Sequence, residues 1–214
     1  MKLIKTLALV SAVFSLTACQ SPYYAAMEKV GVHKREILVD RVEEARDAQT
    51  DTQEEFKSAY ERLVLLSNFD GGEIEKVYQQ LNDDYESSLS SASVVSKRID
   101  SVEDVAEDLF DEWQQELAQY SNASLRNASE KKLKQTERQF SQLLRSMRRA
   151  ESKMEPILAT LKDNVLYLKH NLNAAAISAI KGEFDSLKSE ISSLITDMSK
   201  AVDESNQFIA ALKQ

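Results

Sequence analysis

Apolar residues recur every seven positions along almost the whole chain after residue 37, in two interleaved rows. This heptad pattern places both rows on one face of an α-helix, and such a face packs against neighbouring helices. In the first of four blocks the rows are Leu38, Ala45, Thr52, Ala59 and Leu66, and Val42, Gln49, Phe56 and Leu63. The pattern predicts a long amphipathic helix that ends at the polar residues 67–72.

Three further blocks repeat the pattern over residues 74–120, 133–168 and 177–212, and their predicted core rows include Tyr120, Met147, Leu161 and Met198. Short polar breaks separate the blocks, and short connections join antiparallel neighbours. We therefore predict an all-α fold, an elongated antiparallel helical bundle or coiled coil of about four long helices over residues 31–214. The heptad phase slips at residues 171–173, which indicates a turn, although the last two blocks could also form one continuous helix. Helices of this length would be on the order of 60 to 70 Å long.

Charge provides a second indication of helix pairing. Residues 100–116 carry eight acidic and no basic side chains, whereas residues 131–153 are rich in Lys and Arg. A turn near residue 122 would place these runs side by side, and the expected ion pairs are Asp100 with Arg145, Glu107 with Arg138, and Asp111 with Lys134. The basic run could instead bind an anionic ligand, but the acidic run explains it, and an acidic chain is a poor nucleic-acid binder.

The predicted core thins at one level of the bundle. Small or polar residues replace large apolar ones at Gln49, Thr52, Ser88 and Ala92. The same geometry places Met154 and Ile157 near that level, beside Pro156, which removes one backbone hydrogen bond from its helix. The layer could act as a hinge. Polar residues at heptad core positions more often fix the register between neighbouring helices, which is the alternative.

The first 18 residues have the features of a signal peptide. Lys2 and Lys5 precede an apolar segment, residues 6–18, which is too short to span a bilayer comfortably. Leu16-Thr17-Ala18-Cys19 resembles the lipobox of bacterial lipoproteins, which implies removal of residues 1–18 and attachment of acyl chains such as palmitate to Cys19. Residues 19–30 would form the lipidated tether. An ordinary secretory signal that leaves a free thiol is the alternative.

The residue after Cys19 indicates the membrane to which a lipoprotein is sorted. Gln20 stands where lipoproteins kept at the inner membrane usually have Asp, so the resemblance implies the periplasmic face of the outer membrane. Residues 1–18 contain two of the 27 basic side chains and no acidic one, which leaves 25 basic and 35 acidic side chains and a formal charge of −10. Cys19 is the one cysteine, so we expect no disulfide.

Catalytic and metal motifs are absent from the sequence. The two histidines, His33 and His170, are expected at opposite ends of the bundle, and neither His-Glu-x-x-His nor a phosphate-binding glycine motif occurs. We therefore expect no enzyme activity, no metal and no cofactor.

The turns farthest from the tether are the candidate binding site. They contain apolar side chains among polar ones, and loops commonly carry sites. The candidate partner-binding tip comprises Phe69, Asp70, Gly71, Gly72, His170, Asn171, Leu172 and Asn173. We expect a structural or adaptor role, in which the tip or a flank binds an envelope protein or the cell wall. A periplasmic carrier or holdase that binds a lipid, ligand or unfolded client along the apolar seam is the alternative, and a homo-oligomer stays open.

Two segments resemble a known family. They are Tyr23-Tyr24-Ala25-Ala26-Met27-Glu28-Lys29-Val30-Gly31-Val32-His33-Lys34-Arg35 and Leu166-Tyr167-Leu168-Lys169-His170-Asn171-Leu172-Asn173-Ala174. Both are similar to the proteobacterial lipoproteins grouped as domain-of-unknown-function family 2959. The resemblance implies an envelope lipoprotein of long helices and assigns no activity and no site residues.

Overall fold

A computed structural model describes residues 33–67, 74–171 and 173–213, and it is all-α over these ranges. The long helices are α3 (Lys34–Ser67), α4 (Ile74–Leu117), α5 (Ala123–His170) and α7 (Phe184–Leu212). A short helix, α6 (Ala174–Ile180), and a 3-10 turn (Lys181–Glu183) precede α7. The predicted helical bundle is therefore confirmed, with five helices in the described residues in place of about four.

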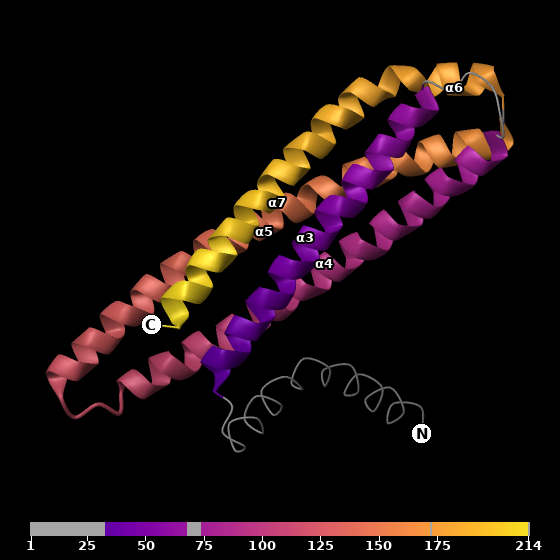
Figure 1. The fold of residues 1–214 in the computed structure, drawn as a ribbon. Coiled ribbons are helices and arrows are strands. Elements are labelled where there is room, and N and C mark those ends of the chain that lie inside the picture. Colours follow the sequence, from indigo (N-terminus) through magenta and orange to yellow (C-terminus); the bar gives the residue numbers. More distant parts are fainter. Residues whose placement is uncertain (1–32, 68–73, 172, 214) are drawn as a thin grey trace, which may run out of the picture.

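The four long helices form an elongated bundle in which each packs against two neighbours (Figure 1). The adjacent pairs are α3 with α4, α4 with α5, α5 with α7, and α7 with α3. At least one ion pair links each adjacent pair of helices, for example Lys34 with Glu112, Arg148 with Asp100, Lys153 with Asp197, and Lys213 with Glu43. The last two predicted blocks form a hairpin of α5 and α7 and not one continuous helix. The four long helices therefore run alternately up and down the bundle.

The core consists of the heptad rows predicted from the sequence. Fully or almost fully buried side chains include Leu38, Phe56, Leu81, Ile99, Met147, Leu161, Leu194 and Met198. Phe110 and Phe208 both pack against Phe140, with ring centroids 5.5 Å and 5.8 Å from it. Burial of this continuous stripe, at about 25 cal/mol for each Å² of apolar surface, is the main stabilising term. Tyr120, predicted as a core position, is exposed because α4 ends at Leu117.

Two other expectations need correction. The fourth block is interrupted at the 3-10 turn, which contains Gly182. A glycine inside an α-helix costs about 1 kcal/mol relative to Ala. The expected pairing of Asp100 with Arg145 is also wrong, since Asp100 contacts Arg148, one turn further along α5. In the described part of the chain, Lys134 pairs with Glu130 of its own helix and not with Asp111. The prediction that acidic residues of α4 pair with basic residues of α5 is therefore correct, but the charged residues meet about one helical turn away from the predicted height.

The two ends of the bundle differ. At the end where α3 begins, the α4–α5 hairpin extends past α3 and past the C-terminus of α7 (Figure 1). Lys34, the first residue of α3, pairs with Glu112, so the last residues of α4 lie beyond α3. At the opposite end, α5 turns into α6. We call the first the near end, because residues 1–32 lead into it, and the second the far end.

Candidate functional site

The far end contains the described part of the predicted tip. His170 is exposed at the last residue of α5. The side-chain Nδ2 of Asn171 donates to the carbonyl of Tyr167 at 3.0 Å, and the side-chain oxygen of Asn173 accepts from the backbone N–H of Ala176 at 3.0 Å. Both asparagines therefore satisfy backbone groups at helix ends, as residues at such positions commonly do. The two asparagines therefore stabilise the turn, whereas the side chain of His170 is exposed to solvent.

Several predicted site residues lie outside the described residues. They are Cys19, with the whole of residues 1–32, and the tip residues Phe69, Asp70, Gly71, Gly72 and Leu172. The helices that flank the last five do reach the far end, since α3 ends at Ser67, α4 begins at Ile74 and α5 ends at His170. His33 lies at the near end and His170 at the far end, so the expected separation of the two histidines is confirmed.

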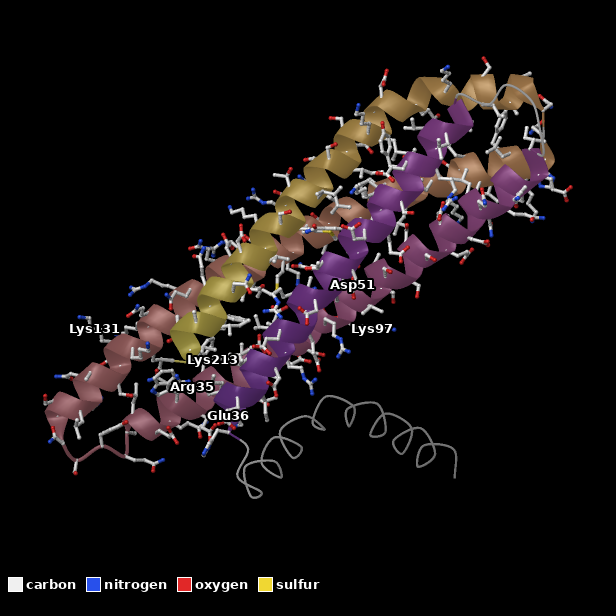
Figure 2. The ribbon with its side chains drawn as sticks, viewed as in Figure 1. Arg35, Glu36, Asp51, Lys97, Lys131 and Lys213 are labelled. Atoms are coloured by element: carbon white, nitrogen blue, oxygen red, sulfur yellow. The ribbon has the colours of Figure 1, made fainter. Side chains whose placement is uncertain are left out.

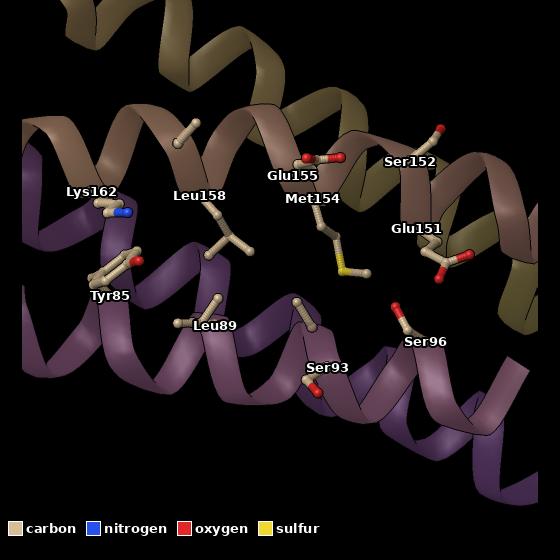
Figure 3. A pocket seen from close by; sticks show the side chains of 12 residues that line it. Tyr85, Leu89, Ser93, Ser96, Glu151, Ser152, Met154, Glu155, Leu158 and Lys162 are labelled. Atoms are coloured by element: carbon tan, nitrogen blue, oxygen red, sulfur yellow. The ribbon is translucent and has the colours of Figure 1, made fainter. Parts of the chain in front are cut away.

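A groove of about 640 Å³ opens between α4 and α5, and we call it the α4–α5 groove. Its apolar side chains are Leu89, Met154 and Leu158, which approach one another across the gap (Figure 3). Polar side chains border it on both helices: Tyr85, Ser93, Ser96, Glu151, Glu155 and Lys162. Leu89 keeps 42% of its surface exposed.

The composition of α4 explains this groove. Residues 87–96 contain six serines and one alanine, so few side chains here reach across to α5. A second groove of about 410 Å³ lies on the other side of the same segment, between α3 and α4, and Thr52, Ser90 and Val94 line it. The thin core layer predicted from the sequence is thus present. Gln49, Thr52, Ser88, Ala92, Met154 and Ile157 are all buried, and Pro156 lies inside α5.

Several buried polar groups have no hydrogen-bond partner among the described residues. They are both side-chain atoms of Gln49, the hydroxyl of Ser88, Nδ2 of Asn164 and Oε2 of Glu204. The other carboxylate oxygen of Glu204 accepts from Gln142 at 3.1 Å. An unpartnered buried polar atom costs about 1 to 3 kcal/mol, so these positions destabilise the bundle locally.

Arg148 of α5 makes ion pairs with two residues of α4 and with one residue of its own helix. Its guanidinium nitrogens donate to Asp100 at 2.7 Å, to Glu103 at 2.6 Å and to Glu151 at 3.0 Å. Partial burial disfavours the charged guanidinium, but the hydrogen bonds to Glu103, Glu151 and Asp100 outweigh this and raise the pKa of Arg148 above its usual value. Arg148 therefore stays charged and links the two helices.

The other basic residues of this region point to solvent. Residues spaced three, four or seven apart share one face of a helix. On the exposed face of α5 this spacing aligns Lys131, Lys134, Arg138, Arg145 and Arg149, which we call the α5 basic stripe. Figure 2 places Lys131 on the outer side of α5. From residue 131 to residue 149 the stripe is about 27 Å long. Its partners in the described chain are Glu130 for Lys134 and Ser141 for Arg145, both on α5 itself.

A smaller pocket of about 320 Å³ lies at the near end, bordered by His33, Trp113, Lys132 and Leu212. The indole N–H of Trp113 donates to the hydroxyl of Ser129 at 2.8 Å, which joins α4 to α5 beside this pocket. Figure 2 shows Arg35, Glu36 and Lys213 at the same end. Farther out on the hairpin, Leu125 is 58% exposed.

The described residues contain neither a metal-ligand cluster nor a membrane-spanning helix. Over the described ranges, no three or more His, Cys, Asp or Glu side chains are grouped closely enough to hold a metal ion. No helix in the same ranges has the length and hydropathy needed to cross a bilayer. Heptad spacing alone does not predict the grooves, although the serine run in α4 is a signal for them, and the α5 basic residues predicted to pair with α4 are mostly exposed.

Comparison with known proteins identifies the family. The model of the family described as "Protein of unknown function (DUF2959)" matches residues 23–212, so the chain belongs to that family. The match covers nearly all of the bundle and agrees with the resemblance of the two segments quoted above. No curated protein and no solved structure matches the chain.

Proposed function

We propose that this member of the DUF2959 family is a lipid-anchored spacer of the bacterial envelope, which holds its far end away from the membrane so that it can bind another envelope component. The observation that carries this proposal is the position of the two ends. Residues 1–32 enter at the near end, and the turn between α5 and α6 lies at the other end of α4. At 1.5 Å per residue, the 44 residues of α4 correspond to about 66 Å.

The proposed anchor is Cys19. Leu16-Thr17-Ala18-Cys19 has the residue types of a lipobox, and residues 1–18 have the features of a cleavable signal. Two or three acyl chains, at about 0.8 kcal/mol for each buried methylene, would hold the chain at a membrane without a spanning helix. Gln20 favours the periplasmic face of the outer membrane. The segment 19–32 would serve as the tether between the lipid and α3.

The proposed binding site is the far end. Here His170 is exposed and the chain reverses direction between α5 and α6. The partner is an envelope protein or a cell-wall component. Such a role needs no catalytic group and no cofactor.

In-cell photo-crosslinking tests the proposed site. A photoreactive residue would replace Asn173 at the far end, with a matched exposed position on α7, Ser199, as the control. The proposal expects a specific adduct from position 173 and none from position 199. A Cys19→Ser variant should leave the membrane fraction and lose the adduct. Equal adducts from both positions, or retention of Cys19→Ser in the membrane fraction, would contradict the proposal.

A carrier function is the second candidate, and the α4–α5 groove favours it. The groove combines about 640 Å³ with the apolar side chains of Leu89, Met154 and Leu158. Its volume is within the ordinary range of ligand pockets, about 300 to 1,000 Å³. An environment-sensitive apolar dye should bind the chain, and Ser93→Trp should reduce that binding by filling the groove. Dye binding that Ser93→Trp leaves unchanged would exclude the groove as the carrier site.

A further inference from the structure

The α4 and α5 helices present charges of opposite sign on one exposed face. On α4, exposed or half-buried acidic residues that lie toward α5 are Asp100, Glu103, Glu107 and Asp111. On α5 the exposed Lys134, Arg138 and Arg145 lie beside them, and within one chain Arg148 makes the ion pairs that join the two helices. Glu107, Asp111, Arg138 and Arg145 are exposed and make no ion pair among the described residues. Most of the charge on this face is thus directed outward.

We propose that this face binds the same face of a second copy of the chain, in a parallel dimer with a two-fold axis along the bundle. Such an axis places α4 of one copy against α5 of the other, and α5 of the first against α4 of the second. Heights along the bundle are preserved, so acidic residues 100–111 of each copy face basic residues 134–145 of its partner. Closed two-fold interfaces of this kind are the commonest form of homo-oligomer.

Other arrangements of two copies do not match the charges. A two-fold axis across the bundle would pair α4 with α4 and α5 with α5 and would separate the charged zones by height. The parallel arrangement alone brings both complementary pairs together. Charge complementarity of this type sets partner choice and direction more than it sets affinity. It also places both near ends on the same side of the dimer.

The α4–α5 groove supplies the apolar centre of this interface. Leu89 and Leu158 lie on the same face as the charged zone and at a different height. In the parallel dimer the groove of one copy would face the groove of the other, which would cover the exposed surface of Leu89. An apolar patch bordered by paired charges is the usual anatomy of a protein interface.

The face is large enough for a stable dimer. Two adjacent helices, each about 10 Å across, present a face about 20 Å wide. Over the length of α4, this gives about 1,300 Å² for each copy, compared with about 800 Å² for each partner in a standard interface. The inference goes beyond the proposed spacer role, and it holds whether or not Cys19 is lipidated.

In-cell cysteine cross-linking of the full chain tests the dimer. Ser93 on α4 borders the groove close to the proposed axis, so Ser93→Cys should give a covalent dimer with a short thiol cross-linker. Ser199→Cys on α7 is the control position and should give none. The chain without an introduced cysteine is a second control, because it shows any cross-linked product that arises from Cys19.

Charge reversal shows whether the two stripes make the contact. In the Ser93→Cys background, R138E/R145E places acidic side chains on α5 opposite the acidic residues of the partner's α4, and E107R/D111R places basic side chains on α4 opposite the basic residues of the partner's α5. Each variant alone should lower the cross-linked fraction by about tenfold or more, since like charges then face each other. When the two variants are produced together with different tags, a mixed dimer should form at the original level. This rescue also shows that both variants fold.

A control variant matches the change in net charge that R138E/R145E produces. K57E/K188E alters two exposed lysines on α3 and α7 and should leave the dimer unchanged. Absence of a Ser93→Cys dimer, or a dimer that both reversals leave intact, would overturn the proposal. An adduct of Ser93→Cys to a different protein would also overturn it. None of these results affects the far-end adduct from position 173, so the dimer and the spacer role can fail separately.

Discussion

The guanidinium Nη2 of Arg148 on α5 lies 2.7 Å from Oδ1 of Asp100 on α4, and the same nitrogen also donates to Glu103. One side chain therefore joins two successive turns of the neighbouring helix. Because each helix of the bundle has a similar long face, such contacts decide which faces meet and at what height. The position of Arg148 fixes the register of the α4–α5 hairpin, and the exposed face of that hairpin is the one proposed to form the dimer.

Arg148→Met should lower the free energy of unfolding by about 0.5 to 1.5 kcal/mol, because it leaves Asp100, Glu103 and Glu151 without their shared cation. The effect is modest since about a third of the Arg148 side chain is exposed. Denaturant unfolding of monomeric protein at low concentration measures it. Arg145→Met, one turn away, should change the free energy by less than about 0.5 kcal/mol. Equal effects of the two substitutions would contradict the proposed role of Arg148.

Leu161→Ala should lower the free energy of unfolding by about 2 to 5 kcal/mol, because Leu161 is fully buried and its truncation leaves a cavity. Leu166→Ala on the same helix is the control, since Leu166 is 48% exposed and should lose little. Thermal unfolding followed by circular dichroism compares the two. Similar losses would mean that α5 does not pack on the face described.

Gln49→Met should raise the free energy of unfolding by about 1 to 2 kcal/mol. The amide of Gln49 is fully buried, and both its polar atoms have no partner, so an apolar side chain of similar shape removes a desolvation cost. Gln53→Met, at a half-buried position of the same helix, should have little effect. A loss of stability in Gln49→Met would show that the amide is hydrogen-bonded in solution.

The pH dependence of Glu130 tests the local pairing on α5. A hydrogen bond from Lys134 and its positive charge hold the pKa of Glu130 below its usual value. A lowered pKa in the folded state means that this interaction stabilises the fold above the usual pKa of glutamate and is lost as the pH falls through the lowered value. Lys134→Gln should raise the midpoint of the Glu130 carboxyl titration observed by NMR. An unchanged midpoint would exclude the pairing.

Much of the fold could be predicted from the sequence because a heptad repeat is a strong and local signal. Phe56, Met147, Leu161 and Met198 were all placed in the core from spacing alone, and all four are buried. The break at Gly182 could not be predicted in the same way, because a single glycine weakens a helix by an amount that packing can compensate. The end of α4 before Tyr120 was missed because the apolar period continues past the last helical residue.

The candidate sites were less predictable. Heptad spacing specifies which face of a helix is buried, but it fixes the height of a neighbouring helix only to within about a turn. Arg145 was therefore predicted in place of Arg148 as the partner of Asp100. The same uncertainty of a turn decides which basic residues are neutralised and which face solvent. Ser88 and Met154 did identify the level of the thin layer, since small side chains leave space wherever the register places them.

The central claim, a spacer that keeps its far end away from the membrane, is tested most directly by energy transfer from labelled protein to acceptor lipids. The full chain would be reconstituted in vesicles through its own anchor, with a donor at Glu36 near one end or at Ser178 in α6 near the other. The spacer predicts strong transfer from position 36 and little from position 178. Equal transfer from both positions would mean that the bundle lies along the membrane, and it would contradict the claim.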